Sequence, residues 1–282
     1  MRKLSTRIRA ALVNAFTHDV ANTAKAAAYS GILTLFPALL VITTLAVRVE
    51  EGGRLLGGLR NIFENFLPDE TLELLQSGAL AHPLRSTQLV VSATGLTLFA
   101  GLGAMLSLME GFRRAYDLPV ADWGFWDRRL RALLLVPIAM VPLSLATLIV
   151  MFGHQIELWM IDNSEHELHR FVLVFWRLAR WSIALAASVV VLTALYHFGT
   201  RRKENWKWVI PGAIAGTLIW FPTTLAFGWY VTRVANYSRF YGSFGAGIAT
   251  LVWLYLTSFS VLLGAELNGL LYRERKQTRS GR

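Results

Sequence analysis

Residues 244–271 read FGAGIATLVWLYLTSFSVLLGAELNGLL, an apolar run of 28 residues whose only charged side chain is Glu266. A helix of about 20 apolar residues is long enough to cross the hydrocarbon core of a bilayer. This run exceeds that length and carries no charge before its last turns, so it predicts a transmembrane helix. How often such runs recur decides the fold of the whole chain.

The same pattern is found along the rest of the sequence. The 282 residues are 54% hydrophobic and 16% charged, whereas soluble domains carry about 25% charged residues. Short charged segments separate five further apolar runs, at 24–47, 89–109, 133–153, 177–198 and 210–233. We therefore expect an all-α polytopic membrane bundle of six transmembrane helices. The expected division is a cytoplasmic amphipathic segment, a membrane domain and a basic cytoplasmic tail, at 1–23, 24–272 and 273–282.

Lysine and arginine are distributed unevenly over the segments between the runs. Of the 28 basic residues, 19 lie in the N-terminal segment, the second and fourth loops and the tail, and nine lie in the other loops. Cytoplasmic segments of membrane proteins are enriched in Lys and Arg. The bias predicts that both termini are cytoplasmic. The first apolar run is longer than the core of a signal peptide, so we expect it to be a retained span.

Two segments outside the runs show helical periodicity. Residues 4–16 place apolar side chains on one face and basic ones on the other, which favours an amphipathic helix on an anionic inner leaflet over a solvated basic tail. The first external loop, 48–88, repeats apolar residues at helical spacing on both sides of Pro68. It predicts two short helices, which either cap the outer mouth of the bundle or rest on the membrane.

Motifs for catalysis are not found in the sequence. The chain has no Gly-x-x-x-x-Gly-Lys-Ser/Thr loop for ATP, no Gly-x-Ser-x-Gly nucleophile turn and no cysteine. His166 and His169 lie in an acidic stretch between two runs, where such a pair is more often solvated than bound to a metal. We therefore expect a protein that is not an enzyme and that uses no cofactor or metal.

Polar residues inside the apolar runs are the candidate functional positions, because hydrocarbon cannot solvate them. Glu266, near the cytoplasmic end of the last run, has two interpretations. It either stays hydrated or pairs with an arginine at the interface, or it is buried with a partner such as Lys25 or His197. The full set of candidate substrate or gating positions is Lys25, Tyr29, Pro37, His197, Arg233, Arg239, Tyr241, Glu266 and Asn268.

Glycine and proline indicate how the helices meet. Gly212 and Gly216 form a Gly-x-x-x-Gly step in the fifth run, and small residues recur in and just before the sixth at Gly242, Ala246 and Gly264. Such positions permit close crossings within one chain or between copies, and packing within one chain is the default expectation. Prolines inside the first, third and fifth runs are expected to kink their helices.

Several stretches resemble a known family. They are 26–37 (AAAYSGILTLFP), 211–213 (PGA) with Trp220, 241–246 (YGSFGA) continuing to 264–268 (GAELN), and 111–116 (GFRRAY) leading to Phe125 and Trp126. Together they cover roughly residues 20–272 and are similar to the YihY/BrkB membrane family. One departure is Ser30-Gly31, where a second aromatic residue or an alanine is expected.

The resemblance implies a bacterial inner-membrane protein with a six-helix bundle. Such families are associated with envelope integrity, serum resistance and, for some members, proposed movement of lipopolysaccharide precursors or other lipids. An older family name, ribonuclease BN, implies RNA cleavage. A soluble metallo-nuclease needs a His-x-His-x-Asp-His type of cluster, and this sequence has none.

The leading functional hypothesis is a transporter or flippase of envelope lipids, either lipopolysaccharide precursors or phospholipids. The prolines inside the runs, the basic inner face and the family resemblance favour it. The alternative is a non-catalytic envelope-integrity scaffold that binds partners through its small-residue faces, and a ribonuclease is the third hypothesis. The expected partners are membrane lipids and further copies of the chain, with no nucleic acid. Because no ATP-binding loop is found, transport is expected to be passive or driven by an ion gradient.

Overall fold

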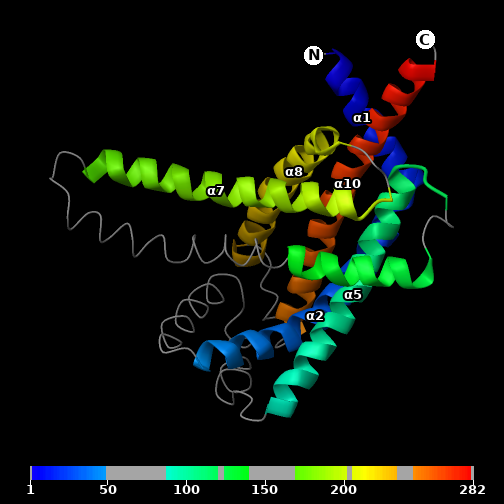
Figure 1. The fold of residues 1–282 in the computed structure, drawn as a ribbon. Coiled ribbons are helices and arrows are strands. Elements are labelled where there is room, and N and C mark those ends of the chain that lie inside the picture. The colour runs from blue at the N-terminus through cyan, green and yellow to red at the C-terminus, as the bar shows by residue number, and fades with distance from the viewer. Residues whose placement is uncertain are drawn as a thin grey trace.

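The computed structural model describes residues 2–48, 87–119, 124–139, 169–201, 205–233 and 244–280. Every regular element in these residues is helical (Figure 1). The elements are α1 (Arg2–Thr17), α2 (Val20–Arg48), α5 (Thr87–Ala115), α7 (His169–Phe198), the 3-10 helix η3 (Trp206–Trp208), α8 (Ile210–Arg233) and α10 (Phe244–Ser280). Residues 125–139 form a further helix. The all-α prediction is confirmed for this part of the chain.

Some predicted features lie outside the described residues. They are the two short helices of 48–88, residues 140–153 of the run 133–153, and the residues His166, Arg239, Tyr241 and Gly242. Ala246 belongs to α10, but its side chain is not among those that the structure describes.

Four helical ranges are long and apolar enough to cross a membrane: Val90–Ala115, Trp181–Phe198, Ile210–Val231 and Gly247–Thr278. They coincide with four of the six runs that the sequence predicts. The run 24–47 forms α2, which is helical throughout but is not among the four. The run 133–153 is described only as far as residue 139. The described residues therefore give a helical membrane protein with four candidate spans.

α10 is the helix that connects the others. It packs against α8, α2 and α5, and its C-terminal turns lie beside α1 (Figure 1). A Cβ atom at Gly264 would come within 2.5 Å of the Gly212 carbonyl oxygen, and one at Gly269 would overlap the Ala115 carbonyl group. Small residues therefore bring the backbone of α10 into contact with both α8 and α5.

α10 also continues past the predicted end of the last span. The segment expected to be a basic tail, 273–282, is helical as far as Ser280. Arg7 of α1 donates two bonds to Glu274, with Nη2–Oε2 at 2.8 Å and Nε–Oε1 at 3.3 Å. α1 buries the small side chains of Ala11 and Ala15. The start of α1 and the end of α10 thus lie at the same end of the bundle (Figure 1).

Two aspartates with left-handed backbone conformations follow helix ends. Asp19 (φ 58°) comes after α1 and Asp117 (φ 50°) comes after α5. Asp adopts this conformation more readily than most residues. Around Asp117 the chain forms a Schellman motif, in which the N–H of Leu118 donates to Arg113 O and the N–H of Asp117 donates to Arg114 O, both at 3.0 Å. These turns place both carboxylates at the end of the bundle that holds the polar residues described next.

Candidate functional site: a charged pocket between α2 and α5

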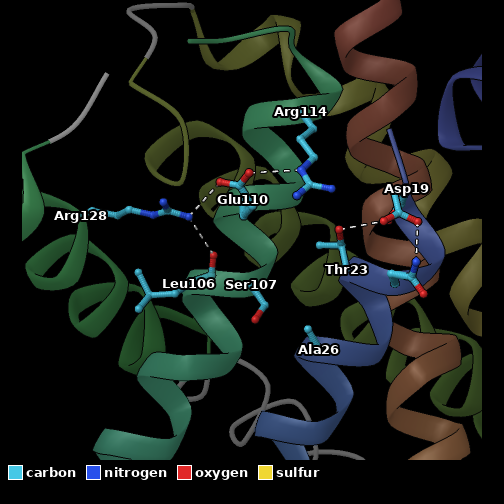
Figure 2. Close-up of a pocket in the computed structure, with 9 residues that line it drawn as sticks. Asp19, Thr23, Ala26, Leu106, Ser107, Glu110, Arg114 and Arg128 are labelled. Carbon is cyan, nitrogen blue, oxygen red and sulfur yellow. Dashed lines mark hydrogen bonds and ion pairs between the residues drawn. The ribbon is translucent and has the colours of Figure 1, made fainter. Parts of the chain in front are cut away.

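A pocket of about 380 Å³ lies between the first turns of α2 and the last turns of α5 (Figure 2). Residues three or four positions apart share a helix face, so Asn22 and Ala26 of α2 both border it. Arg128 reaches it from the helix 125–139. This volume falls within the range of about 300–1,000 Å³ that is usual for small-molecule sites. The lining residues are Asp19, Asn22, Thr23, Ala26, Leu106, Ser107, Glu110, Arg114 and Arg128.

Glu110 is the centre of an ion-pair network on one wall of the pocket. Its carboxylate accepts bonds from Arg113 (Nη2–Oε1 2.7 Å), Arg114 (Nε–Oε1 3.1 Å) and Arg128 (Nη2–Oε2 3.0 Å). Of these arginines, Arg114 and Arg128 line the pocket, so together with Glu110 they give this wall one excess positive charge. Because arginine stays protonated in proteins, the excess persists over the physiological pH range.

The opposite wall carries a negative charge. The Asp19 carboxylate accepts a bond from Asn22 Nδ2 at 2.8 Å, and the Thr23 hydroxyl donates to the Asp19 carbonyl oxygen at 3.1 Å. Figure 2 shows Asp19 and Glu110 on opposite sides of the pocket. Lys25 donates to Asn22 Oδ1 at 3.1 Å, so this candidate lies beside the pocket. The pocket therefore separates a cationic wall from an anionic one.

Glu266 is fully buried and has a partner that the sequence pattern did not indicate. His18 Nδ1 lies 2.9 Å and 3.0 Å from the two carboxylate oxygens of Glu266. The other ring nitrogen of His18, Nε2, lies 3.3 Å from Asp117 Oδ1, and Arg273 pairs with the same aspartate. The hydrated interpretation of Glu266 is therefore wrong in this structure. The two partners expected for a buried Glu266 are wrong as well, because Lys25 bonds to Asn22 and His197 stacks on Trp206.

Asn268 caps a helix other than its own. Its Oδ1 accepts a bond from the N–H of Gly212, and its Nδ2 donates to Val209 O, both at 2.8 Å. Gly212 lies in the first turn of α8, where backbone N–H groups have no partner within the helix. The side chain of Asn268, which is 1% exposed, therefore satisfies the start of α8 and fixes it against α10.

Gly212, Gly216 and Gly264 lie where α8 crosses α10. The Tyr196 hydroxyl of α7 reaches the same crossing and donates to Val261 O at 2.5 Å. A Cβ atom at Gly216 would come within 3.0 Å of that hydroxyl oxygen, and one at Gly264 within 2.5 Å. The three glycines therefore make room for contacts between helices of one chain.

The other described candidates are spread over the bundle. Tyr29 is exposed on α2 and Pro37 is buried inside the same helix. Arg233 is exposed at the end of α8. The His197 ring stacks on Trp206 with 4.4 Å between ring centroids. These candidates do not form one site with Glu266 in the described part of the chain.

The sequence pattern missed the charged residues of the pocket. Glu110, Arg113 and Arg114 have the three- and four-residue spacing at which helical side chains pair, so a local signal was present. Arg128 has no such relation to Glu110, because the two residues are 18 positions apart and lie in different helices. Contact between them depends on how the helix 125–139 folds back on α5.

The lining groups of the pocket are guanidinium, carboxylate, amide and hydroxyl groups, which can form ion pairs and hydrogen bonds with a charged ligand. Among the described residues, no group of three or more His, Cys, Asp or Glu side chains is arranged to hold a metal ion. His169 begins α7.

Comparison with known proteins relates the chain to bacterial membrane proteins. The ribonuclease-like protein YfkH of Bacillus subtilis is 27% identical over 252 residues, which is 88% of this chain and 89% of the relative. A UPF0761 membrane protein of Aromatoleum aromaticum is 24% identical over 258 residues, 86% of this chain and 58% of the relative. A UPF0761 membrane protein of Xanthomonas campestris is 32% identical over 92 residues, 33% of this chain and 21% of the relative.

The chain thus spans little more than half of the Aromatoleum protein and nearly all of YfkH. No solved structure matches it. The family of the virulence factor BrkB matches residues 11–282. This match covers nearly the whole sequence, and together with the four candidate spans it shows that the chain is a membrane protein of the virulence factor BrkB family.

Proposed function

We propose that the protein is a transporter that moves envelope lipids, phospholipids or lipopolysaccharide precursors, between the two leaflets of its membrane. The observation that carries the proposal is the charge-separated pocket between α2 and α5. It lies at one end of the candidate span Val90–Ala115. Glu110 and Arg114 belong to this span, and charged side chains within spans are costly and frequently mark the path of a substrate. A lipid headgroup needs a polar site of this kind where it enters the protein.

The surface of α2 next to the pocket supports a lipid substrate. Asn22, Ala26, Tyr29 and Leu33 are three or four positions apart and therefore follow one helix face. Asn22 and Ala26 line the pocket, whereas Tyr29 (62% exposed) and Leu33 (50% exposed) present apolar groups further along. This face passes from polar to apolar, as a lipid does from headgroup to acyl chains. The sequence contains no ATP-binding loop, so we expect passive exchange or coupling to an ion gradient.

Lipid translocation in proteoliposomes tests the proposal. Purified full-length protein is reconstituted with headgroup-labelled fluorescent phosphatidylethanolamine, and a membrane-impermeant quencher reports how fast the inner leaflet exchanges. We expect exchange to be faster than in protein-free vesicles and to slow when Ala26→Phe fills the pocket. Correct insertion without any acceleration, in the presence and absence of a proton gradient, would contradict transport.

The scaffold and ribonuclease hypotheses are tested with a deletion strain and with the same purified protein. A protein that restores envelope integrity to a deletion strain but moves no lipid is the scaffold. The ribonuclease hypothesis came from the older family name, and the Bacillus relative also carries a ribonuclease-like name. RNA incubated with the purified protein and divalent metal ions tests it, and intact RNA dismisses it.

We also propose an inner-membrane location with both termini in the cytoplasm. α1 and the end of α10 lie together (Figure 1), at the end where the arginines of the pocket lie. The sequence contains no cysteine, so Lys276→Cys introduces a single thiol near the C-terminus. An impermeant maleimide should label it in permeabilised cells and not in intact spheroplasts. Labelling in intact spheroplasts would reverse the orientation.

A further inference from the structure

We infer that the pocket binds a zwitterionic phosphate headgroup, with the phosphate at Arg114 and Arg128 and the ammonium group at Asp19. The inference rests on the proposed function and names the lipid class that the transporter recognises. This class is an aminophospholipid, of which phosphatidylethanolamine is the simplest example. Arg114, Arg128 and Asp19 all belong to the part of the chain that the structure describes.

The cationic wall has donors left for a phosphate. Arg114 uses Nε for Glu110 and Nη1 for the His18 carbonyl oxygen at 3.5 Å. Arg128 uses Nη2 for both Glu110 and the Leu106 carbonyl oxygen at 3.4 Å. A guanidinium group has five N–H donors, so within the part of the chain that the structure describes, Nη2 of Arg114 and Nη1 and Nε of Arg128 remain for a ligand. Planar guanidinium forks match the oxygens of a phosphate group.

The anionic wall favours a cation. The carboxylate of Asp19 has a neutral partner, the amide of Asn22, and a carboxylate accepts several hydrogen bonds. The nearby Lys25 donates to the oxygen of Asn22, so its bond goes to the amide and not to Asp19. An anion without an amine makes no ion pair with Asp19. A ligand that carries both charges satisfies both walls.

The exposed apolar residues favour a headgroup that carries acyl chains. Tyr29 and Leu33 continue the face of α2 that lines the pocket, and both are at least half exposed. The free phosphate ester has no group that could cover them. Acyl chains can lie along this face while the headgroup occupies the pocket, so the lipid is the expected source of the headgroup.

Retention of lipids by the purified protein tests the assignment. Full-length protein is equilibrated with vesicles of equal phosphatidylethanolamine and phosphatidylglycerol, repurified, and its bound lipids are counted by mass spectrometry. Phosphatidylglycerol has the phosphate but no amine. We expect the wild type to retain more phosphatidylethanolamine. Arg128→Gln should lower retention of both lipids about tenfold, the effect of a charge-assisted hydrogen bond of about 1.4 kcal/mol.

Asp19→Asn tests the contribution of the anionic wall separately from that of the cationic wall. Asn adopts the left-handed conformation of position 19 readily, so the turn is retained while the charge is removed. We expect the preference for phosphatidylethanolamine to disappear with little change in bound phosphatidylglycerol. An unchanged ratio of the two lipids would overturn the ammonium assignment.

Two further variants keep the test independent of folding. Arg129→Gln is the matched control, because the guanidinium carbon of Arg129 lies 3.5 Å from the centre of the Phe125 ring and does not line the pocket. It should retain lipid as the wild type does. Ala26→Phe fills the pocket and leaves all its charges in place, so it should release both lipids. Wild-type retention by both Ala26→Phe and Arg128→Gln would overturn the site.

Soluble competitors and the transport assay separate the remaining outcomes. If phosphoethanolamine or inorganic phosphate displaces the lipid at equal concentration, the ligand is the free ester or anion, and the lipid assignment is wrong. Selective lipid binding by a protein that moves no lipid would leave the binding site standing and overturn the transport function.

Discussion

Two sets of polar residues at the same end of the bundle use their hydrogen-bonding groups in different ways. On α10, Glu266 and Asn268 are almost completely buried, and their bonds go to His18, Gly212 and Val209 of the same chain. In the pocket, the arginines around Glu110 are partly exposed. Within the described residues, Arg114 and Arg128 have more donors than Glu110 and the neighbouring carbonyl groups accept.

This difference separates residues that hold the fold from residues that bind a ligand. A polar residue in an apolar helix is a functional candidate by default. When its donors and acceptors are satisfied inside the chain, however, its contribution is to stability. A ligand binds where hydrogen-bond donors or acceptors have no partner within the chain. Substitutions on α10 should therefore change stability first, and substitutions in the pocket should change lipid binding first.

His18→Ala should cause the largest loss of stability. It removes the partner of the fully buried Glu266 carboxylate. Breaking one side of a buried pair costs about 3–5 kcal/mol, and about 3 kcal/mol is expected here because His18 is partly exposed. Thermal unfolding in detergent measures it as a lower Tm. The double variant His18→Ala/Glu266→Ala should recover part of the loss, and a wild-type Tm for His18→Ala would show that the pair is not structural.

Gly264→Ala should have the next largest effect. The added Cβ atom would come within 2.5 Å of both the Gly212 carbonyl oxygen and the Tyr196 hydroxyl oxygen. Overpacking of this kind costs about 1–3 kcal/mol. Gly247→Ala is the matched control in the same helix, because nothing lies within 4 Å of a Cβ atom there. The control should be neutral or slightly stabilising. Equal Tm values for the two variants would show that α8 and α10 do not pack closely at Gly264.

Asn268→Ala tests the cap that α10 provides for α8. It leaves the buried N–H of Gly212 without its bond, at a cost of about 1–3 kcal/mol, whereas the carbonyl of Val209 keeps the bond from the N–H of Ala213. Hydrogen exchange gives a more specific readout than Tm. The Gly212 amide should exchange faster in the variant while amides in the middle of α8 change little. Unchanged protection of Gly212 would show that another group caps the helix.

The spans were predictable from sequence because apolar length is a local property. The runs 89–109, 177–198, 210–233 and 244–271 each lie in a helix that is long and apolar enough to cross a membrane. The helical end of α10 beyond them was not predictable, because it lies beside α1 through Arg7 and Glu274. These two residues are 267 positions apart, and no local pattern connects them.

The candidate site was predictable only in part, for the same reason. Glu266 and Asn268 attract notice because they are polar residues in an apolar run, but the structure gives them partners in the α1–α2 turn and the start of α8. The pocket was missed because its charges stand in segments that resemble ordinary basic loops. Its anionic wall depends on the left-handed turn at Asp19, which places that carboxylate opposite Glu110.

Arg128→Gln should change stability least of these variants and yet remove the most function. Its bond to Glu110 at 3.0 Å is partly exposed, and exposed ion pairs contribute about 0–1 kcal/mol. Glu110 also keeps Arg113 and Arg114 as partners. We therefore expect a Tm close to that of the wild type, together with slow lipid exchange in proteoliposomes. Arg129→Gln should change neither measurement. If Arg128→Gln instead lowered Tm as far as His18→Ala does, the network around Glu110 would be structural like that around Glu266, and the distinction between the two regions would fail.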